Sequence, residues 1–207
     1  MALALGLTLG AGLTGCVTVF PKAIPAQMYR FDVSPSETPP TPSTATPFSV
    51  YRAPTSFNRG ADGDKILTMT GDQAAYVAAA RWVSPASVLF DEAESRAFDL
   101  SGGPARLGRR GELVSAPINL RLDVEAFETR YADGPAAAPT VVVRVRANLT
   151  RVVDRKTLAV RVFESQKKVA DNRVSAIVPG YDAAVSDVLG QIVAWTNDEG
   201  SKQTGAP

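Results

Sequence analysis

Alternating apolar and polar residues mark three consecutive strands in the second half of the chain. Within residues 120–127, 141–149 and 158–162, apolar side chains occupy alternate positions and charged or amide side chains fill most of the others. Turn-forming residues separate these segments at Asp133-Gly134-Pro135 and Asp154-Arg155-Lys156. Consecutive strands with one polar face are typical of antiparallel sheets, because only the other face packs on a core. The pattern predicts a meander-like antiparallel sheet.

Two further segments repeat apolar residues at helical spacing. The first begins at Ser84-Pro85, where serine suits the cap and proline the first turn, and ends at Ser101-Gly102-Gly103-Pro104. The second carries an apolar stripe from Tyr181 to Trp195. Residues 196–207 are polar and are expected to form a frayed, disordered tail. The strands and helices together predict one α+β domain, with two amphipathic helices on one face of the sheet.

The region before the first helix predicts shorter elements. Strands are expected at residues 27–33, 48–53 and 65–70, where β-forming residues alternate. Residues 73–81 are ambiguous, because their alanines favour a helix while their place before Trp82 favours a strand. Residues 34–47 are mostly proline, serine and threonine, which predicts an extended, solvated loop. We therefore expect one domain over residues 27–195 with this loop inside it.

The first twenty residues carry no charged side chain. A cleaved signal peptide, a membrane-spanning anchor and a buried core helix are the three interpretations. Four glycines weaken a spanning helix, and the short apolar run over residues 2–13 fits a signal peptide better. The run ends in Leu13-Thr14-Gly15-Cys16, which holds the sole cysteine. We expect residues 1–15 to be a signal peptide, although no basic residue precedes the apolar run.

This tetrapeptide resembles the bacterial lipobox: an aliphatic residue (Leu13), a small residue (Thr14), glycine (Gly15) and cysteine (Cys16). The resemblance implies that diacylglycerol alkylates the Cys16 thiol, that the chain is cut before Cys16, and that the new amine is acylated. The alternative is a buried free cysteine. With the lipid attached, residues 16–26 form a tether that holds the protein at the periplasmic face of a membrane. Val17 after the cysteine implies the outer membrane, with the inner membrane as the alternative.

Composition narrows the chemistry open to the chain. Its 207 residues include no histidine and one cysteine, which excludes histidine-dependent catalytic triads, internal disulfides and cysteine-rich zinc sites. No nucleophile–base pair or carboxylate pair stands out, so we expect no enzyme, no catalytic residue, no metal and no cofactor beyond the lipid on Cys16. A net charge of +1 argues against nucleic acid as a partner.

Several features between residues 27 and 195 together resemble the ABC-type transport auxiliary lipoproteins, a family that includes the lipoprotein of the paraquat-inducible Pqi system. The features are Tyr29, Asp64-Lys65-Ile66, Tyr76, Ala80-Arg81-Trp82 leading into Ser84-Pro85, the strand block 120–163, and the closing helix with Trp195. Lys65 replaces the usual arginine, and the stretch before Arg81 is unusually rich in alanine. The resemblance also favours a strand for residues 73–81.

The resemblance implies an accessory role beside an MCE (mammalian-cell-entry) lipid transporter. The implied partners are an MCE-domain protein, with its inner-membrane permease and ATPase, and membrane lipid; the implied task is to assist phospholipid transfer between membranes. A homo-oligomer matching a ring-shaped partner is suggested by analogy alone. Arg81 and Trp82 are either core and corner residues or part of an interface, where both residue types are enriched. The alternative function is an envelope assembly or structural lipoprotein unrelated to ABC transport.

Overall fold

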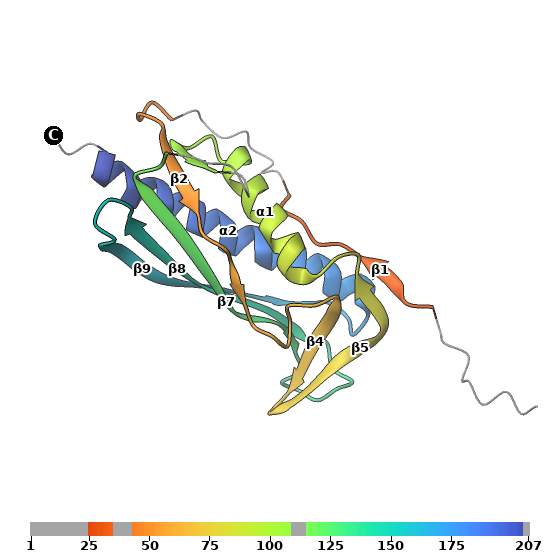
Figure 1. The fold of residues 1–207 in the computed structure, drawn as a ribbon. Coiled ribbons are helices and arrows are strands. Elements are labelled where there is room, and N and C mark those ends of the chain that lie inside the picture. Colours follow the sequence, from red (N-terminus) through yellow and green to blue (C-terminus); the bar gives the residue numbers. More distant parts are fainter. Residues whose placement is uncertain (1–24, 35–42, 109–114, 205–207) are drawn as a thin grey trace, which may run out of the picture.

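The computed structural model describes residues 25–34, 43–108 and 115–204, which form one nine-stranded sheet and two helices (Figure 1). The strands are β1 (Gln27–Tyr29), β2 (Phe48–Arg52), β3 (Ser56–Phe57), β4 (Lys65–Thr70), β5 (Gln73–Trp82), β6 (Ala105–Leu107), β7 (Ile118–Arg130), β8 (Thr140–Arg151) and β9 (Thr157–Lys168). The helices are α1 (Ala86–Leu100) and α2 (Val174–Thr204). The chain is thus α+β, as predicted, and residues 73–81 belong to a strand.

β7 is the strand on which the rest of the sheet is built. One of its edges pairs with β8 in antiparallel register along almost its whole length, and β9 pairs with β8 in the same way. Its other edge pairs with β2, β3 and β4 in turn, and all three run parallel to it. Residues 48–70 therefore follow β7 as one interrupted strand. The first interruption contains Pro54, which has no backbone N–H to donate to a neighbouring strand.

The predicted antiparallel meander is correct for β7, β8 and β9 and wrong for the rest of the sheet. β1 also pairs with β5, and β6 with β2, in parallel register, so the sheet is mixed. Parallel strands need a long crossover connection. Here the connection from β4 back to β7 contains β5, α1 and β6, and residue alternation along single strands does not reveal that path.

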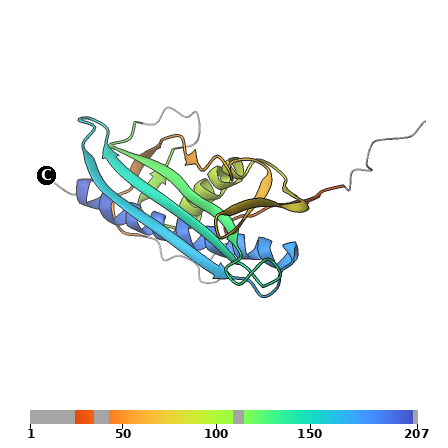
Figure 2. The same ribbon diagram turned by 90° about the horizontal axis from the view of Figure 1, so that it is seen from below.

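α2 packs across β8 and β9, and α1 lies beside α2 (Figure 2). α1 begins at Ala86, so Ser84 does not cap it; Pro85 takes that position and makes no side-chain capping bond. α2 continues to Thr204, so the prediction of a frayed tail from residue 196 is wrong over residues 196–204. Tertiary contacts hold this last part: Thr196 is buried, and the Asn197 side chain accepts a hydrogen bond from the Ala105 backbone N–H at 2.9 Å.

Candidate functional site

The lipobox residues Leu13, Thr14, Gly15 and Cys16 lie outside the residues that the structure describes. The signal peptide, the lipid on Cys16 and most of the tether therefore stay predictions from the sequence. The described chain begins at Pro25, and β1 follows two residues later. Any tether from Cys16 must therefore enter the domain through β1.

Trp82 lies in the core and is 1% exposed. Its ring packs edge-on against Phe31 and Tyr181, with ring centroids 5.0 Å and 5.1 Å away. Tyr181 in turn hydrogen-bonds with the Thr129 hydroxyl at 3.2 Å, and burial raises the pKa of Tyr181 far above its ordinary value. These contacts join β5, α2 and the segment after β1. Trp82 is thus a core residue, which leaves Arg81 as the member of the predicted pair that reaches solvent.

Arg81 lies where β1, β4 and β5 meet. Its guanidinium pairs with the Asp64 carboxylate at 2.9 Å, and both side chains are nearly half exposed. The Asp64 backbone carbonyl also accepts a hydrogen bond from the Trp82 N–H at 2.7 Å. The sequence feature Asp64, Arg81 and Trp82 therefore meet at one corner of the sheet. There the Asp64–Arg81 ion pair lies at the surface and the Trp82 indole lies in the core. An exposed pair of this kind contributes little to stability, about 0–1 kcal/mol.

The outer edge of β5 is unpaired over residues 73–79 among the described strands. β4 pairs with one side of this segment, whereas β1 pairs on the other side only with Ala80, Arg81 and Trp82. Four of its seven residues are alanine, most of its side chains are exposed, and Tyr76 is 46% exposed. An unpaired edge offers backbone N–H and C=O groups to another strand, which makes this edge a surface suited to a protein partner.

Exposed apolar side chains lie near this edge. Met28 on β1 is 58% exposed and Val83, directly after β5, is 47% exposed. Tyr76 is held in place because its hydroxyl donates to the Gly60 carbonyl at 3.1 Å and the Lys65 ammonium lies 5.1 Å from its ring centroid. We call Met28, Tyr76, Val83 and the free edge over residues 73–79 the β5 surface.

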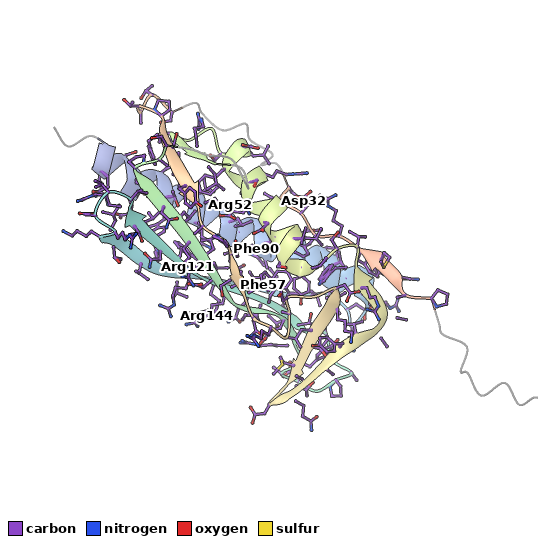
Figure 3. The ribbon with its side chains drawn as sticks, in the orientation of Figure 1. Asp32, Arg52, Phe57, Phe90, Arg121 and Arg144 are labelled. Atoms are coloured by element: carbon purple, nitrogen blue, oxygen red, sulfur yellow. The ribbon has the colours of Figure 1, made fainter. Side chains whose placement is uncertain are left out.

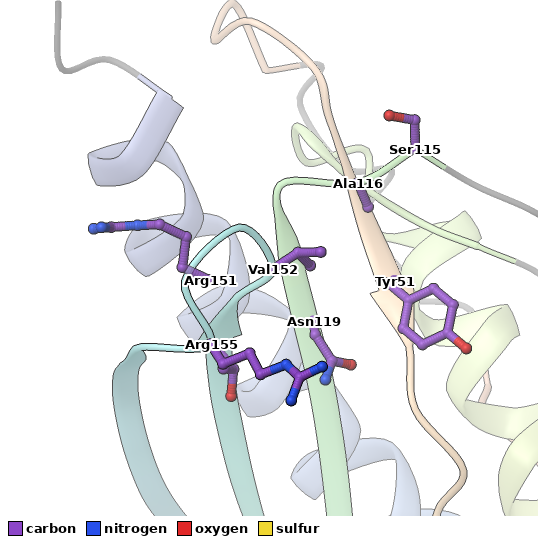
Figure 4. A pocket seen from close by; sticks show the side chains of 8 residues that line it. Tyr51, Ser115, Ala116, Asn119, Arg151, Val152 and Arg155 are labelled. Atoms are coloured by element: carbon purple, nitrogen blue, oxygen red, sulfur yellow. The ribbon is translucent and has the colours of Figure 1, made fainter.

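A cleft of about 520 Å³ opens near the far end of the sheet, on the face opposite the helices (Figure 4). Strand register places Tyr51 beside Asn119 and Asn119 beside Thr150, so these residues form one row across β2, β7 and β8. The turn from β8 to β9 closes one side with Val152 and Arg155. Figure 4 shows the Arg155 guanidinium beside Asn119, on the side facing Tyr51, whereas Arg151 points away. We call this the Tyr51–Arg155 cleft.

Most other arginines on this face are matched by carboxylates. Arg144 and Arg146 each donate to Glu125, at 3.0 Å and 2.8 Å, and the hydrogen bond from Arg146 is the main reason that the pKa of Glu125 lies below its ordinary value. Arg121 pairs with Asp123 on β7 (Figure 3). This part of the face is a network of solvated ion pairs with little surplus charge.

A second groove, of about 560 Å³, lies beside α1 and differs in charge. It is lined by two arginines and three carboxylates. Within it, the Arg52 guanidinium pairs with Asp91 at 3.0 Å and with Glu94 at 2.7 Å, almost closed to water. These charges pair with one another inside the protein. The charged residues of this groove therefore stabilise the fold, and we do not assign a binding role to them.

Within residues 25–34, 43–108 and 115–204, no helix is long and apolar enough to cross a membrane. In the same part of the chain, no group of three or more acidic or cysteine side chains could hold a metal ion. Ser165 and Lys167 both contact the Asp187 carboxylate, at 2.7 Å and 2.8 Å, but Ser165 is buried, so this group holds α2 to β9 and offers no nucleophile to a substrate.

The chain belongs to the family of ABC-type transport auxiliary lipoprotein components, whose model matches residues 29–193. The match spans most of the described fold, from the end of β1 into α2, and confirms the family resemblance found in the sequence. It defines the protein as an auxiliary component of a transport system. A search of curated proteins found no match.

Solved structures that share this fold include the following two. Protein XCC0632 from Xanthomonas campestris is 24% identical, with a TM-score of 0.75, and the alignment covers 87% of this chain and 100% of that one. The hypothetical protein CT253 from Chlamydia trachomatis is 13% identical, with a TM-score of 0.51, and covers 74% of this chain and 98% of that one. The likeness extends over nearly the full length of both relatives.

Sequence reasoning singled out neither the free edge of β5 nor the Tyr51–Arg155 cleft. Tyr51, Asn119 and Arg155 lie far apart in the chain and meet only through the register of β2 on β7 and β7 on β8. One signal was present: Val152-Val153 stands at a turn otherwise made of charged residues. In the structure Val153 is 87% exposed, which is unusual for valine.

Proposed function

We propose that this protein is lipid-anchored through Cys16 at the periplasmic face of the outer membrane and assists an ABC transporter of the MCE type. In this role it docks on the MCE-domain protein, whose permease and ATPase lie in the inner membrane, and helps pass phospholipids between the membranes. The family match over residues 29–193 is the observation that carries the proposal. The lipobox at residues 13–16 supplies the anchor.

The β5 surface supports a protein-binding role near the anchored end. Residues 16–26 span at most about 40 Å when fully extended, so the β1 end of the domain stays within that distance of the membrane. A partner strand that adds to residues 73–79 would gain backbone hydrogen bonds, while Met28, Tyr76 and Val83 would be covered. A docked partner of this kind would hold the transporter next to the lipid anchor.

Co-purification of the full chain from envelope membranes tests the proposal. We expect the wild-type chain to recover an MCE-domain protein after crosslinking. Ala75→Lys places a charge on the exposed strand β5 and should reduce recovery about tenfold, because a cation disfavours strand addition. Thr157→Lys, on exposed β9, is the matched control and should leave recovery unchanged. Failure of the wild-type chain to recover any MCE-domain protein would contradict the transport role.

The anchor is tested separately with Cys16→Ser. Without the thiol no thioether to diacylglycerol can form, so the variant should move from the detergent phase to the aqueous phase. Mass spectrometry of the wild-type chain should find three acyl chains on a mature protein that begins at Cys16. An unmodified thiol with an intact leader would overturn the proposed anchor, and recovery in the inner-membrane fraction would overturn the proposed outer-membrane location.

A further inference from the structure

Among the described residues, the lining of the Tyr51–Arg155 cleft carries positive charge without any carboxylate. Its residues are Tyr51, Ser115, Ala116, Asn119, Thr150, Arg151, Val152 and Arg155. The groove beside α1 is of similar size, but its lining combines Arg52 and Arg96 with Asp91, Glu92 and Asp99, and both arginines form ion pairs. These two hollows have similar volumes but different charge: the groove lining includes carboxylates, whereas the described lining of the cleft includes arginines and no carboxylate.

Arg155 is the cation available to a ligand. The carboxylate nearest in sequence, Asp154, already pairs with Arg151 at 3.1 Å and accepts the Lys156 backbone N–H at 3.1 Å. No ion pair or hydrogen bond of the Arg155 side chain is found within the described residues, whereas Arg151 also donates to Gln203 at 3.0 Å. The turn therefore uses its one acidic residue to fix its own geometry and leaves the Arg155 guanidinium over the cleft (Figure 4).

The backbone of Arg155 is held in an unfavourable conformation. Its φ is +57°, in the left-handed region that glycine or asparagine usually occupies. The hydrogen bond from the Arg151 N–H to the Lys156 carbonyl, 2.8 Å long, closes the turn around it. Arginine at such a position gains nothing for the turn itself, so a role for its side chain is the simplest reason for it.

The rest of the cleft is apolar or neutral. The exposed ring of Tyr51 and the apolar side chains of Val152 and Ala116 all line it. Val152 also borders a smaller hollow of about 260 Å³ that includes Val153, whose side chain is almost fully exposed. A volume of about 520 Å³ is far larger than a free phosphate needs and falls in the range of sites for organic ligands. The preferred ligand is therefore an anion that carries apolar groups.

We propose that the Tyr51–Arg155 cleft binds an anionic glycerophospholipid, with its phosphate on the Arg155 guanidinium and its acyl chains along Tyr51, Val152 and Val153. The guanidinium matches two phosphate oxygens through paired N–H donors. The choice of a lipid rests on the proposed transport function, whereas the anionic and apolar character of the ligand rests on the cleft itself.

Native mass spectrometry of the full chain, released from micelles doped with phosphatidylglycerol, tests this assignment. We expect the wild-type chain to retain phosphatidylglycerol and Arg155→Gln to retain it about tenfold less well, because a charge-assisted hydrogen bond is lost. Arg121→Gln is the matched control: it removes an exposed arginine of the same sheet face and should leave retention unchanged. Thermal unfolding of both variants should match the wild type, which excludes misfolding as the cause.

Two further probes separate the sources of the anion. Diacylglycerol lacks the phosphate and glycerol 3-phosphate lacks the acyl chains, and each should bind about tenfold more weakly than phosphatidylglycerol. Equal binding of diacylglycerol, equal binding of glycerol 3-phosphate, or unchanged retention by Arg155→Gln would each overturn the assignment.

The outcome is also separable from that of the proposed function. Strand register places the β8–β9 turn, which contains Arg155, beside the start of β7, whereas β4 and its neighbour β5 lie at the other end of β7 (Figure 1). Arg155→Gln should therefore still recover the MCE-domain protein. Arg155-dependent lipid binding without any recovered partner would leave the cleft assignment intact and contradict the transport role. Recovery of the MCE-domain protein with no lipid retained by the wild-type chain would support the transport role and contradict the cleft assignment.

Discussion

Arg52 shows how a single charged residue joins the sheet to α1. Its side chain is 8% exposed and its guanidinium contacts two carboxylates of the helix, Asp91 and Glu94 (Figure 3). It also donates to the Asp91 carbonyl and to the Ser95 hydroxyl, at 2.8 Å and 3.0 Å. Burying three charges together is tolerable only while each remains opposite a counter-charge. Arg52 is therefore required to keep α1 in place against β2.

Replacing Arg52 with alanine should lower the free energy of unfolding by about 3–5 kcal/mol, because Asp91 and Glu94 would stay buried without this cation. Arg121→Ala removes an arginine from an exposed ion pair with Asp123 and should change the free energy of unfolding by about 0–1 kcal/mol. Urea denaturation followed by circular dichroism measures both values. Equal decreases in the free energy of unfolding in the two variants would contradict the prediction that the buried Arg52 ion pairs contribute more than an exposed pair.

At the scale of elements, α2 is the long support of the fold, and its glycines show which face is packed. A Cβ at Gly180 would lie 2.7 Å from Val169 Cγ1 and 3.0 Å from Val141 Cγ2, so the helix approaches the sheet closely there. A Cβ at Gly190 would meet nothing within 4 Å, and Gly190 is exposed. Gly180 thus faces the sheet, whereas Gly190 faces solvent.

Opposite effects are therefore expected when each glycine is changed to alanine. Gly190→Ala should raise the free energy of unfolding by about 0.5–1 kcal/mol, because alanine loses less conformational freedom in a helix. Gly180→Ala should lower it by about 1–3 kcal/mol through overpacking against Val169 and Val141. Thermal unfolding of the two variants measures the difference. A stabilising Gly180→Ala would contradict the close approach of α2 to β8.

The elements also show what a sequence pattern can and cannot predict. β7, β8 and β9 were predictable because one face of each is apolar and the connections between them are turns. The parallel placement of β2, β3 and β4 on β7 was not, since it depends on the path of more than forty intervening residues. The end of α2 was missed because polar residues such as Asn197 are held by tertiary hydrogen bonds that composition does not reveal.

The same limit applies to the candidate sites. The lipid on Cys16 stays a prediction, which a local motif was sufficient to make. Trp82 and Arg81 were singled out together, but burial distinguishes them, and burial requires the fold. The Tyr51–Arg155 cleft depends on strand register, so no local motif could have predicted it.

For the whole molecule, the lack of histidine has a consequence for stability against pH. Histidine is the side chain whose ordinary pKa lies between about pH 6 and 8, and this chain has none. At lower pH the carboxylates control stability. The pKa values of Asp187 and Glu125 lie below their ordinary values, chiefly because Lys167 and Arg146, respectively, donate hydrogen bonds to them. Their stabilising effect is present above the unfolded pKa and is lost as the pH falls through the folded pKa. Asp182 opposes this trend, because burial raises its pKa.

Above this range the tyrosines decide the trend. Burial raises the pKa values of Tyr181 and Tyr131, so the folded state favours the protonated phenols, and stability should fall as the pH rises above about 10, where the unfolded chain ionises. Melting temperatures between pH 3 and 11 should show a plateau from about pH 5 to 9 with a decline on each side. Tyr181→Phe should reduce the alkaline decline, and an unchanged decline would rule out Tyr181 as its source.

The length of α2 sets the spacing between the two ends of the protein. Asp182 receives a hydrogen bond from the Asp32 backbone shortly after β1, and Gln203 accepts one from Arg151 beside the Tyr51–Arg155 cleft. About 30 Å of helix separates these two contacts. With Cys16 anchored as proposed, a headgroup bound in the Tyr51–Arg155 cleft would therefore lie about one helix length beyond the β1 end, where the tether joins the domain. Under the proposed anchoring, the domain would hold this cargo away from the bilayer by its own length in addition to the length of the tether.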